Sequence, residues 1–296
     1  MKDPVLVATD GGQEGAHALK LAAAYAVAED VPVEVVSVVT PLSDLPMPLP
    51  HRAELEQAHA QGVADAVRRH LREIVGPVDW PIHVSLGRPA PAICTTARRR
   101  SAHLVILGVA GPQSDGNDTA LELLHLAEKP VLVARAGRLP TNVVVGIDFR
   151  ASSLRTADLA RRMLRSGGTL HLVHVKPSLD FPAASVWNWG SCYECAVEGG
   201  FDELAERLAK GGAEVTWETR AGDPAEVLMN LASDRGSDLL AIGSDGYICN
   251  NRVVVGRVAR EILGSSPVPI LATPVTTLMD GELAELSAAE GVTQGA

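Results

Sequence analysis

The sequence contains few aromatic residues and few cysteines. Aromatic residues make up 3% of the 296 residues, whereas hydrophobic residues of all kinds make up 46%. A buried core must therefore consist mainly of Val, Leu, Ile and Ala, a composition that suits parallel sheets buried on both faces. Four cysteines in a chain of this length are too few for a disulfide scaffold.

Other missing features exclude whole classes of function. The formal net charge is −10, so the chain lacks the overall positive charge of a typical nucleic-acid-binding domain. No apolar run approaches the roughly 20 residues that span a bilayer, and Asp10 comes too early for the apolar core of a secretion signal. We therefore expect a cytoplasmic protein that binds neither nucleic acid nor membrane.

An internal repeat is the most informative pattern in the sequence. The segment that starts at Pro4 matches the segment that starts at Asn142, and the apolar runs of the two end in Asp10 and Asp148. Further matching blocks follow in the same order, with 135 to 139 residues between corresponding positions. Collinear blocks at nearly constant spacing indicate two copies of one domain.

Each copy alternates short apolar runs with segments of helical periodicity. Runs such as Val143–Ile147 and Leu239–Ile242 have the length and composition of buried strands. Alternating strands and helices predict an α/β fold of two tandem Rossmann-like or flavodoxin-like domains, each with a five-stranded parallel sheet flanked by helices. The predicted domains span residues 1–136 and 141–275, and an acidic flexible tail spans residues 276–296.

A glycine loop after the fourth predicted strand of the second copy carries the strongest functional signal. Gly243 and Gly246 are followed, after nine further residues, by Gly256. Arg257 comes next and starts a predicted helix. Glycines let a backbone approach a phosphate closely, and a helix N-terminus offers free amides and a positive dipole end. The Arg257 guanidinium could bind phosphate oxygens or, alternatively, fill the phosphate site.

Two further residues belong to the same edge of the predicted sheet. Asp148 ends the first strand of the second copy, and Val175 ends the second strand, where its main chain could meet an adenine. Ligands of open α/β sheets bind at these carboxyl ends of the strands. The glycine loop has a plain alternative role as a turn between strand and helix. The third glycine at this spacing, beside Asp148, favours a nucleotide site.

The glycine spacing, between an apolar strand and a helix, resembles that of the universal stress protein family. The resemblance covers both copies, so the chain is identified as a tandem member. It implies ATP, ADP or AMP in the second copy, with Mg²⁺ as an accompanying ion left open. The family has Ser or Thr where this chain has Arg257. The site that the resemblance implies consists of Asp148, Val175, Gly243, Gly246, Gly256, Arg257 and Val258.

The first copy departs from this glycine pattern. Gly108 and Gly111 are present, but only five residues separate Gly111 from Asn117, which takes the place of the third glycine. Asp118 then takes the place of Arg257. Because acidic groups replace a cradle for anions, we predict that the first copy binds no triphosphate and acts as a structural partner.

Cys192 and Cys195 form a Cys-x-x-Cys pair in an insertion that also holds Trp187 and Trp189. A zinc site and a reversible disulfide are alternatives to ordinary reduced thiols on a mobile insertion. A zinc ribbon needs a second cysteine pair, which the sequence lacks, so the reduced thiols are favoured. The insertion itself is interpreted as a lid over the nucleotide, a contact surface or a cover for one sheet edge.

The resemblance, together with these patterns, implies a nucleotide-binding regulator or sensor of the stress response with an unidentified protein partner. The sequence shows no Ser-His-Asp set, carboxylate pair or Walker lysine in the sequence context that catalysis requires, so at most slow ATP hydrolysis is expected. The alternatives are a protein-interaction module that binds no nucleotide and a thiol redox protein that uses Cys192 and Cys195. The resemblance also implies an intramolecular pseudo-dimer through the last strand of each copy, and pairing of two chains as a homodimer.

Overall fold

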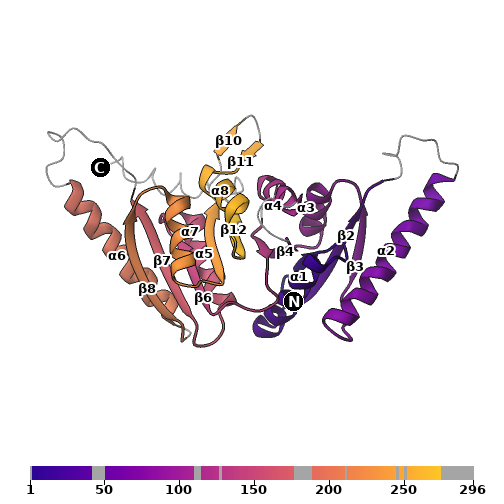
Figure 1. Cartoon of the computed structure of the whole chain (residues 1–296), viewed down its shortest axis with the longest axis horizontal. Coiled ribbons are helices and arrows are strands. Elements are labelled where there is room, and N and C mark those ends of the chain that lie inside the picture. The colour runs from indigo at the N-terminus through magenta and orange to yellow at the C-terminus, as the bar shows by residue number, and fades with distance from the viewer. Residues whose placement is uncertain are drawn as a thin grey trace, which may run out of the picture.

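The computed structural model describes residues 2–41, 51–109, 115–126, 129–176, 189–210, 212–244, 247–249 and 252–274. Figure 1 shows the chain as two similar halves side by side. The first half comprises β1 (Val5–Ala8), α1 (Gln13–Glu29), β2 (Val33–Val39), α2 (Arg52–Ile74), β3 (Ile82–Leu86), α3 (Pro89–Arg99), β4 (Leu104–Gly108), α4 (Asp115–Leu126) and β5 (Val131–Ala134).

The second half repeats this order of elements and adds a small hairpin. It comprises β6 (Asn142–Gly146), α5 (Ala151–Met163), β7 (Thr169–Lys176), α6 (Trp189–Ala209), β8 (Glu214–Ala221), α7 (Pro224–Asp234), β9 (Leu239–Ser244), β10 (Tyr247–Cys249), β11 (Arg252–Val254), α8 (Arg257–Ser265) and β12 (Ile270–Pro274). No helix in the described part of the chain is long and apolar enough to cross a membrane.

One ten-stranded sheet runs through both halves in the order β3-β2-β1-β4-β5-β12-β9-β6-β7-β8. Neighbouring strands within each half are parallel, whereas β5 and β12 pair antiparallel, with Leu132 opposite Leu271. The predicted α/β class and the two Rossmann-like halves are confirmed. The predicted pseudo-dimer through the last strands is confirmed as well, and it joins the two five-stranded sheets into one mixed sheet.

Two hydrophobic cores cover the faces of this sheet. Val5 and Val7 face the core formed with α1, α2, α5 and α6. Leu6 and Ala8, which alternate with them, face the core formed with α3, α4, α7 and α8. Each core contains residues of both halves, and α2 and α6 lie at opposite outer ends of the molecule (Figure 1).

The strand order creates one crevice in each half. The chain leaves β1 toward β2 and β3 and later returns on the other side as β4, so the order reverses between β1 and β4. The same reversal lies between β6 and β9 in the second half. In open α/β sheets, ligands bind at such a reversal, outside the carboxyl ends of the strands.

The interpretation of the Cys-x-x-Cys segment as a mobile insertion is wrong from residue 189 onward. Residues 189–209 form helix α6, which covers β8 as α2 covers β3. Phe201 of this helix stacks on Trp217 of β8, with ring centroids 4.9 Å apart. Cys195 is exposed on α6. Trp187 lies outside the described residues, as does the predicted tail at 276–296.

The glycine loop of the second half contains an element that the sequence reasoning missed. Strands β10 and β11 pair antiparallel as a short hairpin between β9 and α8. In Figure 1 the hairpin projects from the top of the second half near the junction of the halves. Strand β11 contacts α4, so the loop of one half lies against a helix of the other.

Candidate functional site

A cavity of about 320 Å³ lies at the carboxyl ends of β6, β7 and β9. It occupies the crevice where the strand order of the second half reverses. The cavity brings together six of the seven residues predicted from the sequence: Asp148, Val175, Gly243, Gly256, Arg257 and Val258. The seventh, Gly246, lies outside the described residues.

Gly243 has a packing role in addition to its place in the cavity. A Cβ atom at this position would lie 2.7 Å from Ser152 Oγ and 2.8 Å from the backbone nitrogen of Ser153. The N-terminal turn of α5 therefore packs directly on the end of β9, and only glycine leaves room for it. This close packing is a role for Gly243 that neither the phosphate-loop prediction nor the turn alternative included.

Asp148 organises the turn that leads from β6 into α5. Its Oδ1 accepts a hydrogen bond from the backbone N–H of Arg150 at 3.0 Å. Asp10 forms the same turn in the first half, where its Oδ1 accepts from the N–H of Gly12 at 2.8 Å. The second oxygen, Oδ2, of Asp148 lies 3.8 Å from Arg150 Nε. The side chain is exposed at the cavity and can meet a ligand.

Arg257 is the first residue of α8, and its side chain reaches the N-terminus of α7. Its Nη2 donates to Asp223 Oδ2 at 2.6 Å, and its Nη1 donates to Glu261 Oε2 at 3.0 Å. The hydrogen bond from Arg257 lowers the pKa of Asp223, so this carboxylate stays charged. The Arg257 side chain is 64% exposed. The guanidinium is therefore held at the rim of the cavity by two carboxylates.

The two helix N-termini at the cavity differ in how their amides are used. Helix α7 is capped by Asp223, whose Oδ1 accepts from the backbone N–H of Ala225 and Glu226. Helix α8 has Gly256 as its N-cap residue and no side-chain cap. Its first amides therefore donate to no side-chain cap among the described residues, and the dipole of α8 favours negative charge there.

Three polar residues that line the cavity are absent from the site predicted from the sequence: Arg150, Ser153 and His174. His174 Nδ1 donates to the carbonyl of Ile147 at 2.7 Å, so Nε2 is the acceptor for the hydroxyl of Tyr193. The sequence offered one clue to two of these residues: His174 directly precedes Val175, and Arg150 follows Asp148 by two positions in the same turn.

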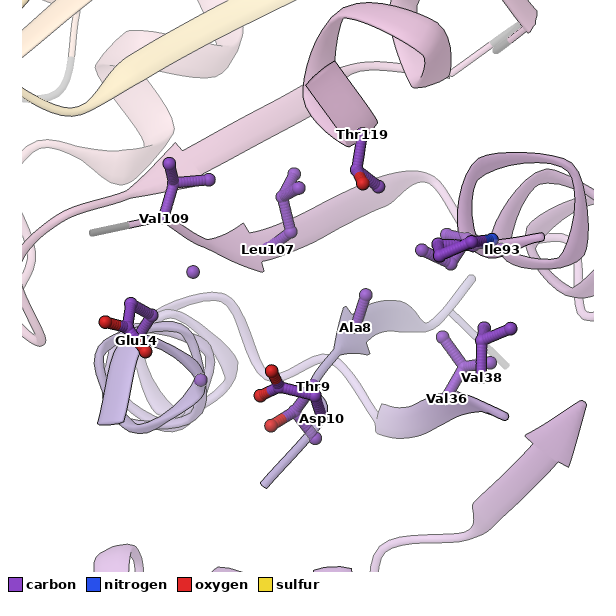
Figure 2. Close-up of a pocket in the computed structure, with 13 residues that line it drawn as sticks. Ala8, Thr9, Asp10, Glu14, Val36, Val38, Ile93, Leu107, Val109 and Thr119 are labelled. Carbon is purple, nitrogen blue, oxygen red and sulfur yellow. The ribbon is translucent and has the colours of Figure 1, made fainter. Parts of the chain in front are cut away.

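The first half contains an equivalent cavity, also of about 320 Å³, which Figure 2 shows in close-up. Asp10, Val38 and Gly108 line it at the positions that correspond to Asp148, Val175 and Gly243. The first half has thus kept the cavity even though its glycine pattern is shortened. Its loop residues 110–114 lie outside the described residues.

The zinc alternative for Cys192 and Cys195 involves the side chain of Cys192, which lies outside the described residues. No group of three or more His, Cys, Asp or Glu side chains that could hold a metal gathers in the described part of the chain. Cys195 is an exposed free thiol on α6.

The profile of the universal stress protein family matches residues 1–135 and again residues 140–274. The chain belongs to the universal stress protein family. A universal stress protein of Mycolicibacterium smegmatis is 25% identical over 295 residues, which cover 90% of this chain and 95% of the relative. This coverage of both halves confirms the tandem arrangement.

Solved structures of universal stress proteins share the fold. A universal stress protein from Archaeoglobus fulgidus superposes with a TM-score of 0.66 at 17% identity, over 92% of this chain and 98% of that chain. Another universal stress protein, solved in complex with cAMP, matches 45% of this chain and 96% of its own at 23% identity and a TM-score of 0.35.

Proposed function

We propose that this tandem universal stress protein binds an adenine nucleotide in the second-half cavity and acts as a nucleotide-responsive regulator of the stress response. One observation carries the proposal: six residues selected from the sequence for nucleotide binding line one cavity. Its volume of about 320 Å³ lies within the usual range of small-molecule sites. The protein partner and the homodimer expected from the sequence stay predictions.

The cavity offers an apolar part and a polar part that suit the base and the sugar. Val173, Val175, Leu228 and Ile242 supply apolar walls for an adenine ring. The Asp148 carboxylate is a hydrogen-bond acceptor at the strand end, and ribose hydroxyls are donors that it can bind. These contacts would orient the nucleoside with its phosphates toward α8.

The phosphate end of the proposed site is formed by α8 and two arginines. The uncapped N-terminal amides of α8 and the guanidinium groups of Arg150 and Arg257 favour an anion. The Arg257 guanidinium already donates to Asp223, so a phosphate would bind Arg257 alongside this carboxylate or in its place. Mg²⁺, if bound, would neutralise the phosphates beside Asp148, and we assign no catalytic step to the site.

The first experiment removes any co-purified nucleotide and titrates the protein with ATP by calorimetry. We expect about one ATP per chain. Asp148→Ala should weaken binding by at least about tenfold, the usual scale for a lost hydrogen bond to a charged group. Asp10→Ala is the matched control, because Asp10 forms the same turn in the first half. Equal affinities of wild type and Asp148→Ala would overturn the proposal.

A second variant tests the role of Arg257. Asp223→Asn keeps an N-cap side chain on α7 but removes the charge that holds the guanidinium. Freed from this partner, Arg257 should bind phosphate better, and we expect ATP affinity to rise roughly two- to fivefold. Weaker binding in this variant would mean that the intact Arg257–Asp223 pair is itself needed for the nucleotide.

A further inference from the structure

The cavity of the first half has the architecture of the second-half cavity but lacks its arginines. Glu14 and Asp10 line it, and none of its described lining residues is Lys, Arg or His. The second-half cavity is lined by Arg150 and Arg257. In the repeat, Gly12 stands at the position of Arg150.

The second arginine is also replaced in the first half, by Asp118. The packing of the two helices fixes this correspondence, because their buried positions match: Ala120, Leu123 and Leu124 of α4 correspond to Ala259, Ile262 and Leu263 of α8. Thr119 of α4 lines the first cavity as Val258 of α8 lines the second. Asp118 therefore occupies the place of Arg257, and its side chain is exposed.

The surrounding groups leave the first cavity negative. Helices α1 and α3 both begin at the cavity, and their two dipoles contribute about one positive charge in total, which the two carboxylates of Asp10 and Glu14 exceed. Arg88 precedes the lining residue Pro89, and its Nη2 donates to Glu122 at 2.6 Å. Its charge is therefore already balanced on the surface.

The rest of the cavity wall is largely apolar. Figure 2 shows Val36, Val38 and Ile93 toward one side of the cavity and Glu14 toward the other, with Leu107 and Val109 along the wall between them. The hydroxyl-bearing Thr9 and Thr119 line it as well, together with Ala8 and the acidic Asp10. Such a site matches a ligand with an apolar body and a positively charged end.

We propose that the first-half cavity binds a small organic amine. Its apolar body lies against Val38, Ile93 and Leu107, and its ammonium group donates hydrogen bonds to Asp10 and Glu14. A phosphate ligand would meet these two carboxylates instead of the arginines of the second half. The inference does not depend on nucleotide binding, because a different cavity and different residues carry it.

The test uses three probes that share a phenylethyl body and differ in charge: 2-phenylethylamine, 2-phenylethanol and 3-phenylpropanoate. The isotope-labelled full-length protein is titrated with each probe and followed by the NMR shifts of its backbone amides. We expect the amine to bind at least about tenfold more tightly than the alcohol, and the acid to bind most weakly. The largest shifts should lie at Val38 and Thr119.

Charge-removing variants show whether the two carboxylates cause the preference. Asp10→Asn combined with Glu14→Gln should reduce the preference for the amine over the alcohol to within about twofold. Asp148→Asn in the second half is the matched control and should keep the full preference. Equal binding of amine and alcohol to wild type, tighter binding of the acid, no shifts with the amine, or an unchanged preference in the double variant would each overturn the proposal.

Discussion

At the scale of single residues, an ion-paired cluster around the buried carboxylate of Glu34 links the outer strands of the first half. Glu34 of β2 accepts hydrogen bonds from His83 of β3 at 2.7 Å and from Arg100, at the end of α3, at 2.6 and 2.7 Å. The hydrogen bond from Arg100 is the main cause that lowers the pKa of Glu34. A carboxylate that is 9% exposed is thereby compensated on two sides.

The second half contains the same cluster with two residue types exchanged. His171 takes the place of Glu34, and its Nε2 donates to Glu218 of β8 at 2.7 Å. Arg235, at the position of Arg100, donates to the same carboxylate oxygen at 2.9 Å. The pair needs one carboxylate and one histidine on neighbouring strands, and it also forms with the two residues exchanged between the strands. The two halves have therefore kept the interaction while exchanging the residues.

His171 should make stability depend on pH. Burial is the main cause that lowers its pKa, so the unfolded chain binds its proton more readily than the folded chain. The free energy of unfolding should therefore fall as pH drops from about 7 through the ordinary histidine range near 6.5. Urea unfolding at pH 7.5 and 5.5 measures this loss, and His171→Gln should reduce it.

Two comparisons make the pH experiment specific to the buried cluster. His59 is exposed on α2, so His59→Gln should retain the wild-type dependence. His103 is also expected to contribute, because burial lowers its pKa as well, so the His171 variant should keep a smaller decline. A decline in His171→Gln as large as in wild type would show that this histidine is not its source.

At the scale of elements, the sequence predicted the strands well and the connections poorly. Continuous apolar runs such as Leu239–Ile242 match strands. A strand that is buried on both faces needs apolar residues at every position, so a short stretch of sequence is enough to identify it. The start of α6 at Trp189 was missed because an aromatic-rich segment with two cysteines has no clear helical periodicity. The hairpin β10–β11 was missed because its strands are only three residues long.

Gly243 provides a test of how elements pack. Gly243→Ala should destabilise the protein by about 1–3 kcal/mol, because the added Cβ meets the N-terminal turn of α5. Gly199→Ala is the control: this glycine lies inside α6 with no neighbouring atom within 4 Å of its Cβ position. The control should stabilise by up to about 1 kcal/mol. Urea midpoints measure both, and equal stability of Gly243→Ala and wild type would contradict the packing argument.

At the scale of the whole molecule, the two halves form one continuous unit. Leu132 and Leu271 face each other across the antiparallel β5–β12 pair, and both are fully buried. Glu29 and Arg162 add an ion pair between the halves at 2.7 Å, although an exposed pair of this kind contributes at most about 1 kcal/mol. The continuous sheet and the two shared cores therefore carry most of the coupling.

This continuity predicts that the halves unfold together. Trp80 belongs to the first half and Trp217 to the second, and both pack against the same core. In each variant that keeps one of these tryptophans and replaces the other three with Phe, the fluorescence midpoint in urea should equal the midpoint of the far-UV circular dichroism of that same variant within error. Two separate midpoints would mean that each half is stable alone and that the β5–β12 contact contributes little.

The sequence by itself determined the α/β class, the repeat, the family and six residues that line one cavity, because strand composition, helical periodicity and glycine spacing are local properties of the chain. Tertiary structure alone decided that Asp223, 34 residues away, binds Arg257, that Gly243 lies against α5, and that the first half keeps a cavity of equal size. These features depend on side chains brought together by folding, and no local pattern records which distant residues will meet.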